Sequence, residues 1–121
     1  GMVVDWGYRS DDLPVKLFGS WTTLPAGPAT LAARTKAVIV PVMARRTEDG
    51  RYTPVMFDPV EVPDTSPAAL AAATQAIADA LEEMIADAPD QWYTFKPMWP
   101  ASDDEVVELE RRATEARVSD A

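Results

Sequence analysis

The residues best suited to bind an anion lie in one short stretch of the sequence. Residues 22–27 read T-T-L-P-A-G, so the hydroxyls of Thr22 and Thr23 are followed by Gly27 at the start of a predicted helix. Hydroxyls and free backbone N–H groups at a helix N-terminus are a natural site for phosphate or carboxylate. Most such turns do no more than cap a helix, and this simpler interpretation stays open.

Arginines form a second candidate site. Arg45 and Arg46 end an apolar run, and Arg9 follows the first apolar segment of the chain. Side chains at the ends of strands in α/β sheets often face the ligand crevice, and a guanidinium suits a lipid or nucleotide phosphate. The alternative is that paired arginines beside the acidic residues 48 and 49 only solvate the end of a hairpin.

A dense aromatic stretch forms the third candidate. Trp92, Tyr93, Phe95 and Trp99 fall within eleven residues that also hold two prolines. These rings could line a groove for an acyl chain, or they could close the core of a small domain, which is the commoner use of aromatic area.

Composition narrows the chemistry that the chain can perform. It contains no histidine and no cysteine, which removes the commonest general base, thiolate catalysis, disulfides and sulfur-ligated metals. Few catalytic designs survive these two absences; we name no catalytic residue, and we expect no metal site and no cofactor. The net charge is −9, and clustered cations are needed to bind phosphate backbones, so we expect no nucleic-acid partner.

The elements that would position these residues fit a single domain. With 121 residues of which 47% are hydrophobic, the chain is long enough for one compact core. No apolar run approaches the roughly 20 residues of a membrane span, so we expect a soluble, cytoplasmic protein. The acidic second half of the chain is typical of a solvated face.

The first half of the sequence predicts hairpins and one short helix. Strands at 2–5 and 15–18 are expected to pair across the turn at 9–12, with an irregular segment at 20–26 and a helix at 28–35. The run A-V-I-V-P-V-M at 37–43 predicts a strand buried on both faces. A turn at 47–50 should return it as a second strand at 52–57, where Pro54 indicates a sheet edge.

The second half predicts two helices. Ser66 and Pro67 should begin a long helix that ends near Asp87, with its large apolar residues on one stripe. Residues 102–105 read S-D-D-E, a capping box that begins a charged terminal helix within 101–121. The fold class that follows is α/β, with a small mixed sheet covered by the helices at 67–87 and 28–35.

Taken together and in this order, five segments resemble the bacterial lipid A biosynthesis acyltransferase family, including its phosphatidylinositol mannoside acyltransferases. They are D-W-G-Y-R at 5–9, L-F-G at 17–19, T-T-L-P-A-G-P-A-T-L-A at 22–32, V-I-V-P-V at 38–42 and P-D-Q-W-Y-T-F-K-P-M-W at 89–99. The last is the most specific of them. The resemblance implies that residues 2–100 are the C-terminal half of a partial three-layer, lysophospholipid acyltransferase-like domain, followed by the charged helix.

The resemblance also implies an activity. Members transfer an acyl group from acyl-CoA or acyl carrier protein to a hydroxyl of a membrane glycolipid or phospholipid at the inner membrane face. Their general base is a histidine in an H-x-x-x-x-D/E motif, which lies upstream of the segments matched here. We therefore expect this chain to lack the catalytic base and to be inactive alone.

The residues that carry over from the family are those of the substrate crevice. Asp5 and Arg9 are implied at its wall, Thr22, Thr23 and Gly27 near the acceptor or thioester, and Arg45 at the strand end. The alternative function is a non-catalytic module that binds lipids or proteins, because a half-sheet would leave an unpaired edge and favour homo-oligomers. A carboxylate-dependent hydrolase has no supporting pair of residues in the sequence.

Overall fold

The computed structural model describes residues 1–118, and its first sheet is a tight antiparallel hairpin. β1 (Leu13–Leu17) pairs with β2 (Ser20–Leu24), with Leu17 opposite Ser20. Phe18 and Gly19, with φ of 52° and 75°, form the two-residue turn, and positive φ at both positions suits the twist of a hairpin.

The predicted pairing of this region was therefore wrong. Residues 2–5 form no strand, and residues 20–24, which were expected to be irregular, form β2. The sequence signal was misleading because a phenylalanine occupies the first turn position, where Asn, Asp or Gly is usual. The strand expected at 15–18 exists, but it begins at Leu13 and ends at Leu17.

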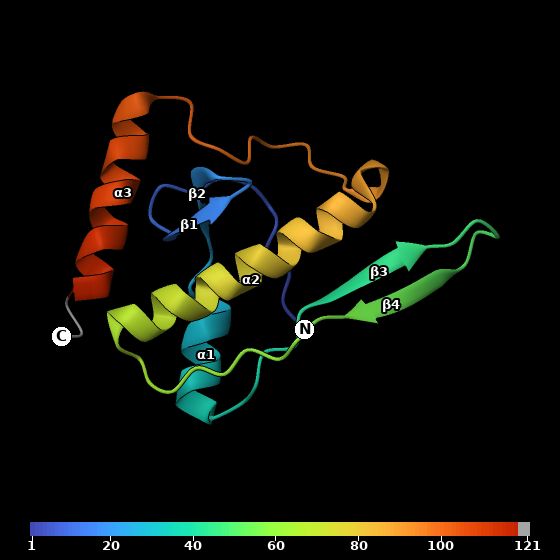
Figure 1. Ribbon diagram of the computed structural model, residues 1–121, viewed down its shortest axis with the longest axis horizontal. Coiled ribbons are helices and arrows are strands. Elements are labelled where there is room, and N and C mark those ends of the chain that lie inside the picture. The colour runs from blue at the N-terminus through green and yellow to red at the C-terminus, as the bar shows by residue number, and fades with distance from the viewer. Residues whose placement is uncertain (119–121) are drawn as a thin grey trace.

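Both helices predicted in the central part of the chain are confirmed. α1 (Gly27–Thr35) has Pro28 in its first turn and ends at Lys36, which adopts the left-handed conformation. α2 (Pro67–Asp87) begins after Ser66, whose hydroxyl accepts a hydrogen bond from the Ala69 N–H at 3.2 Å. In Figure 1, α2 crosses the centre of the molecule between the two hairpins.

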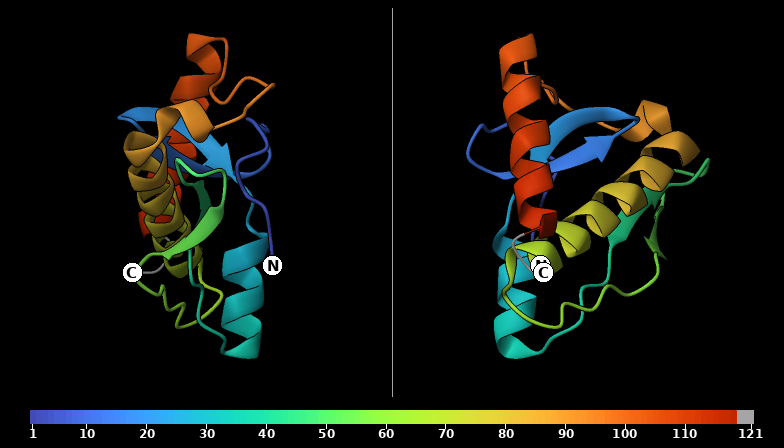
Figure 2. Two further views of the ribbon diagram at one scale, coloured as in Figure 1. Left: turned by 90° about the vertical axis from the view of Figure 1, so that its right-hand side faces the viewer. Right: turned by 60° about the vertical axis from the view of Figure 1, so that its left-hand side comes forward.

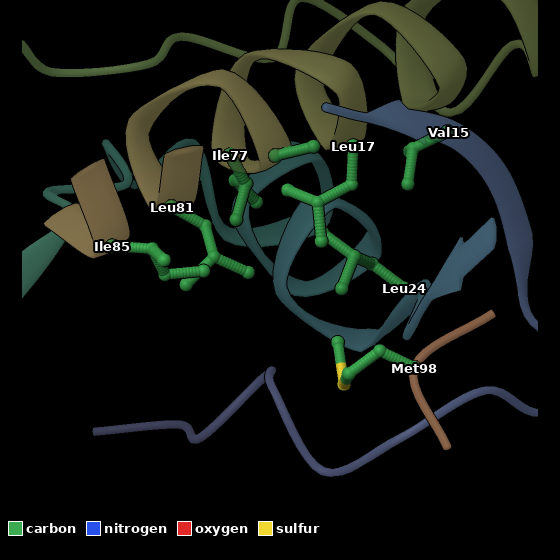
Figure 3. Close-up of a cluster of buried hydrophobic side chains, with 8 residues drawn as sticks. Val15, Leu17, Leu24, Ile77, Leu81, Ile85 and Met98 are labelled. Carbon is green, nitrogen blue, oxygen red and sulfur yellow. The ribbon is translucent and has the colours of Figure 1, made fainter. Parts of the chain in front are cut away.

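The core lies between α2 and the β1–β2 hairpin. Figure 3 shows side chains from the two hairpin strands pointing toward the apolar stripe of α2, with Met98 closing the far end. Trp92 and Trp99 pack against this cluster, whereas Tyr93 and Phe95 are exposed. Within the aromatic stretch, the two tryptophans therefore help to close the core, whereas Tyr93 and Phe95 do not. The cluster comprises Val15, Leu17, Leu24, Ile77, Ala78, Leu81, Ile85 and Met98.

The second sheet is also a hairpin, and it projects from the rest of the molecule (Figure 1). β3 (Val42–Arg46) pairs with β4 (Tyr52–Met56) in antiparallel register, which confirms the predicted hairpin, its turn and the edge position of Pro54. The strand predicted at 37–43 was partly wrong, because β3 begins only at Val42. Burial on both faces was also wrong, since Val38, Val40 and Val42 are each about half exposed.

The α/β class is confirmed, while the single mixed sheet is replaced by two separate antiparallel hairpins. The chain continues from α2 through a short 3₁₀ helix, η1 (Pro89–Gln91), to the terminal helix α3 (Asp103–Val118). As predicted, Ser102 caps α3, and its hydroxyl accepts a hydrogen bond from the Glu105 N–H. Residues 119–121 of the predicted terminal helix lie outside the described residues.

The terminal helix is part of the packed structure. Leu109 is buried, and Figure 2 shows α3 standing beside the β1–β2 hairpin and crossing the start of α2. Across residues 1–118, no helix is both long and apolar enough to cross a membrane.

Candidate functional site

The structure contains an apolar groove of about 710 Å³. Its walls are α1, the second half of α2, the extended residues 37–44 and the N-terminal segment 1–5. Side chains that line it include Leu31, Val40, Ile77, Leu81 and Met84. The polar side chains among its lining residues are those of Asp5, Thr35 and Gln91. The groove suits an apolar occupant far better than a charged one.

Asp5 is one of the residues that line this groove. Its carboxylate accepts a hydrogen bond from the indole N–H of Trp92 at 3.1 Å, and Trp92 itself packs on the core. Asp5 is half-buried. This bond joins the N-terminal segment to the loop after α2, two regions that are 87 residues apart in the chain.

The hydroxyls of Thr22 and Thr23 are buried and already hydrogen-bonded. Thr22 donates to the carbonyl of Met98. Thr23 donates to the carbonyl of Arg9 at 2.7 Å and accepts from the Arg9 N–H at 3.1 Å. Both side chains therefore hold loops against β2 from inside the protein, and neither hydroxyl is exposed to solvent.

Thr23 bonds the backbone of Arg9, whereas the Arg9 side chain is more than half exposed. Its guanidinium lies 5.7 Å from the centre of the Trp6 ring and 3.9 Å from the carboxylate of Asp12. Burial raises the pKa of Asp12 above its ordinary value, while the nearby cations Arg9 and Arg112 act in the opposite direction. Arg112 of α3 also donates to the carbonyls of Ser10 and Asp12, at 2.9 and 2.8 Å, which fixes this loop from its far side.

Gly27 is the first residue of α1 and is exposed. A side chain placed on it would approach the Met2 methyl group at 3.1 Å, so the N-terminal segment passes close to this helix start. The N-cap residue Ala26 offers no side-chain cap. The hydroxyls expected beside Gly27 are bonded to Met98 and Arg9 instead.

Arg45 and Arg46 connect the projecting hairpin to the end of α2 and to η1. The Arg45 guanidinium forms an ion pair with Asp87 at 2.9 Å, with about half of each side chain exposed. The backbone of Arg46 forms two hydrogen bonds with the side-chain amide of Gln91, its N–H donating at 2.7 Å and its carbonyl accepting at 2.9 Å. Neither arginine is paired with the acidic turn that follows in the sequence.

The six predicted site residues thus lie in several different parts of the structure. Arg9 and Thr23 are directly bonded, Thr22 is their neighbour on β2, and Asp5, Gly27 and Arg45 stand at other positions. Sequence reasoning missed Gln91 and Arg112, whose partners are backbone groups far away in the chain. Within residues 1–118, no three carboxylates gather into a metal-binding group.

Comparisons with known proteins support the family resemblance that the five sequence segments indicated. A family model described as bacterial lipid A biosynthesis acyltransferase matches residues 1–100, which leaves α3 outside the match. The chain is 38% identical over 102 residues to a phosphatidylinositol mannoside acyltransferase of Mycolicibacterium smegmatis, covering 82% of this chain and 30% of that protein. A protein of the same name from Mycobacterium tuberculosis is 36% identical over 87 residues, covering 72% and 26%. The chain spans less than a third of the length of these relatives.

Proposed function

This chain belongs to the bacterial lipid A biosynthesis acyltransferase family, and from that membership we propose that it is one part of a membrane-lipid acyltransferase. The complete enzyme would transfer an acyl group from acyl-CoA or acyl carrier protein to a hydroxyl of a glycolipid or phospholipid. The names of its relatives favour a phosphatidylinositol mannoside as the acceptor. The ordered match over residues 1–100 is the observation that carries this proposal.

The chain would supply the scaffold of such a site but not its base. In acyl transfer, a base removes the proton of the acceptor hydroxyl, and the resulting alkoxide attacks the thioester carbonyl and expels the thiolate of the donor. The 121 residues contain no histidine to serve as this base. We place the base in a part of the complete enzyme that these residues do not include, so the chain alone is inactive.

The six candidate residues receive different roles within this proposal. The guanidinium groups of Arg9 and Arg45 are about half exposed, so they suit the phosphates of a donor or of a lipid headgroup. Gly27 would present the start of α1 to the same ligand. Asp5, Thr22 and Thr23 would act by positioning, since their polar atoms are bonded inside the protein.

Residues 2–100 would form the acyltransferase portion, with residues 101–121 as an added segment that contains α3. The working location would be peripheral, at the inner face of the cell membrane, where the acceptor lipid lies. α3 would then stabilise the loop that carries Arg9, through the bonds from Arg112 to the carbonyls of Ser10 and Asp12.

An acyl-transfer assay tests the proposal. The purified chain, given acyl-CoA and phosphatidylinositol mannoside, is expected to give no product above the rate without protein. A chimera of the Mycolicibacterium smegmatis relative, with its 102 aligned residues replaced by those of this chain, is expected to recover the activity. Turnover by the chain alone, or a folded chimera that fails to transfer acyl groups, would contradict the proposal.

A second candidate function is a non-catalytic, self-associating module that binds lipids or proteins. It is favoured by large exposed apolar side chains, above all Phe95, which is 95% exposed, and Tyr52, Met56 and Tyr93, each about two-thirds exposed. Light scattering over a range of concentrations tests it. This candidate predicts a mass that rises to a dimer or beyond, and a constant monomer mass would exclude it.

A further inference from the structure

One edge of the structure carries a row of backbone groups without partners. Ile39 exchanges both of its hydrogen bonds with Val60, so the N–H and C=O groups of its neighbours Val38 and Val40 point the opposite way. Within residues 1–118, these four groups form no hydrogen bond.

The same row continues along β3. The Phe57 N–H donates to Pro41, and Thr47 donates to Arg51, so the odd-numbered residues of this strand face β4. The alternation of an antiparallel pair then directs the backbone groups of Val42, Ala44 and Arg46 to the outer edge. Pro41, which has no N–H, faces inward, so the outer row from Val38 to Arg46 has no missing donor.

One end of this edge is already paired with an amide group. At the end of the row, the side-chain amide of Gln91 donates to and accepts from the backbone of Arg46, as a residue of a neighbouring strand would do. Gln75 closes the edge of β1 in the same way, through two bonds of 2.9 Å to the backbone of Lys16. The edge of β1 is thus protected, whereas residues 38–44 are left open beside the apolar groove.

The unpaired backbone groups along this edge determine which kind of partner can cover it. An acyl chain could fill the groove, but it would leave the N–H and C=O groups of Val38 and Val40 buried without partners, at a cost in free energy. An antiparallel pair of two copies with Val40 opposite Val42 would place Lys36 opposite Arg46, and this repulsion of like charges disfavours that register. A single strand satisfies the backbone and covers the three half-exposed valines.

We propose that the outer edge of residues 38–44 receives one β-strand from the part of the acyltransferase that this chain does not include. The inference rests on the proposed function, since the relatives extend over more than three times the length matched here. The strand would carry branched apolar residues over Val38, Val40 and Val42. Acidic residues at its ends would complement Lys36 and Arg46.

Amide hydrogen exchange resolved to single residues tests this edge, with the chain's own alternation as the control. In the isolated chain, the outer amides of Val38, Val40, Val42 and Ala44 should exchange quickly, while the inner amides of Ile39, Met43 and Arg45 are protected. In the chimera described above, the outer amides should gain at least roughly tenfold protection, with the inner ones little changed. Coexpression of this chain with the remainder of the relative provides the same comparison if the chimera does not fold.

A matched pair of substitutions separates the contribution of the Val40 backbone N–H from that of the Val40 side chain. Val40→Pro removes one outward N–H, while Val40→Thr keeps that N–H and a branched side chain. In the chimera, Val40→Pro should lower the protection of the neighbouring outer amides of Val38 and Val42 by at least roughly tenfold, the factor for one lost hydrogen bond of about 1.4 kcal/mol, and Val40→Thr should keep most of that protection. Neither change should shift the unfolding of the isolated chain, because this N–H has no partner there.

The possible failures can be told apart. Outer amides that stay unprotected in an active chimera would overturn the edge inference and leave the proposed function standing. Outer amides that become protected in an inactive, folded chimera would support the edge and contradict the proposed function. Protection of the outer amides in the isolated chain that rises with concentration would assign the edge to a second copy and overturn the inference.

Discussion

Replacing Leu17 by alanine is expected to lower the free energy of unfolding by about 3 kcal/mol, one of the largest effects of any single substitution in this chain. Leu17 is completely buried, and its side chain lies between the stripe of α2 and Leu24 (Figure 3). Truncation removes apolar contacts and leaves a cavity that the hairpin can only partly fill, because its backbone is fixed by the two-residue turn. Urea denaturation followed by circular dichroism measures the change.

Leu31→Ala is the matched control for this prediction. It makes the same chemical change on α1, but Leu31 is 55% exposed and lines the open groove. Its loss should be within about 0.5 kcal/mol, because alanine also favours a helix. Equal losses at the two positions would show that the core does not lie between α2 and the hairpin.

The sequence predicts well those elements whose signals are local. The helix of 21 residues from Pro67 to Asp87 follows from its cap, its N-terminal proline and its apolar stripe, and all three are seen. The hairpin of β3 and β4 follows from two apolar runs around an acidic, glycine-containing turn. In both cases the information lies within a few residues of the element that it specifies.

The errors occur where the outcome depends on distant partners. Residues 37–43 have the composition of a strand buried on both faces, but within the described residues their backbone pairs along one edge alone, with Val60, Phe57 and β4, and Val38, Val40 and Val42 remain about half exposed. Thr22 and Thr23 were assigned to an anion site because hydroxyls precede a helix. Their hydroxyls instead bond Met98, which is 76 residues away, and the backbone of Arg9. A sequence carries no local signal for such contacts.

Replacing Thr22 by valine tests that structural assignment and is expected to cost about 1 to 3 kcal/mol of stability. Valine has nearly the same shape, so packing is kept, but the carbonyl of Met98 loses the hydroxyl that donates to it in a fully buried position. The loop that carries Met98 and Trp99 should loosen with it. Tryptophan fluorescence during urea denaturation reports this change together with the global transition.

Thr74→Val provides the control, because Thr74 is equally buried and its hydroxyl also donates to a carbonyl. That carbonyl belongs to Leu70, four residues earlier in α2, and it keeps the helical hydrogen bond from the Thr74 N–H after the substitution. Thr74→Val should therefore change stability by less than about 0.5 kcal/mol. If Thr22→Val were equally harmless, the hydroxyl of Thr22 would not be holding the Met98 loop.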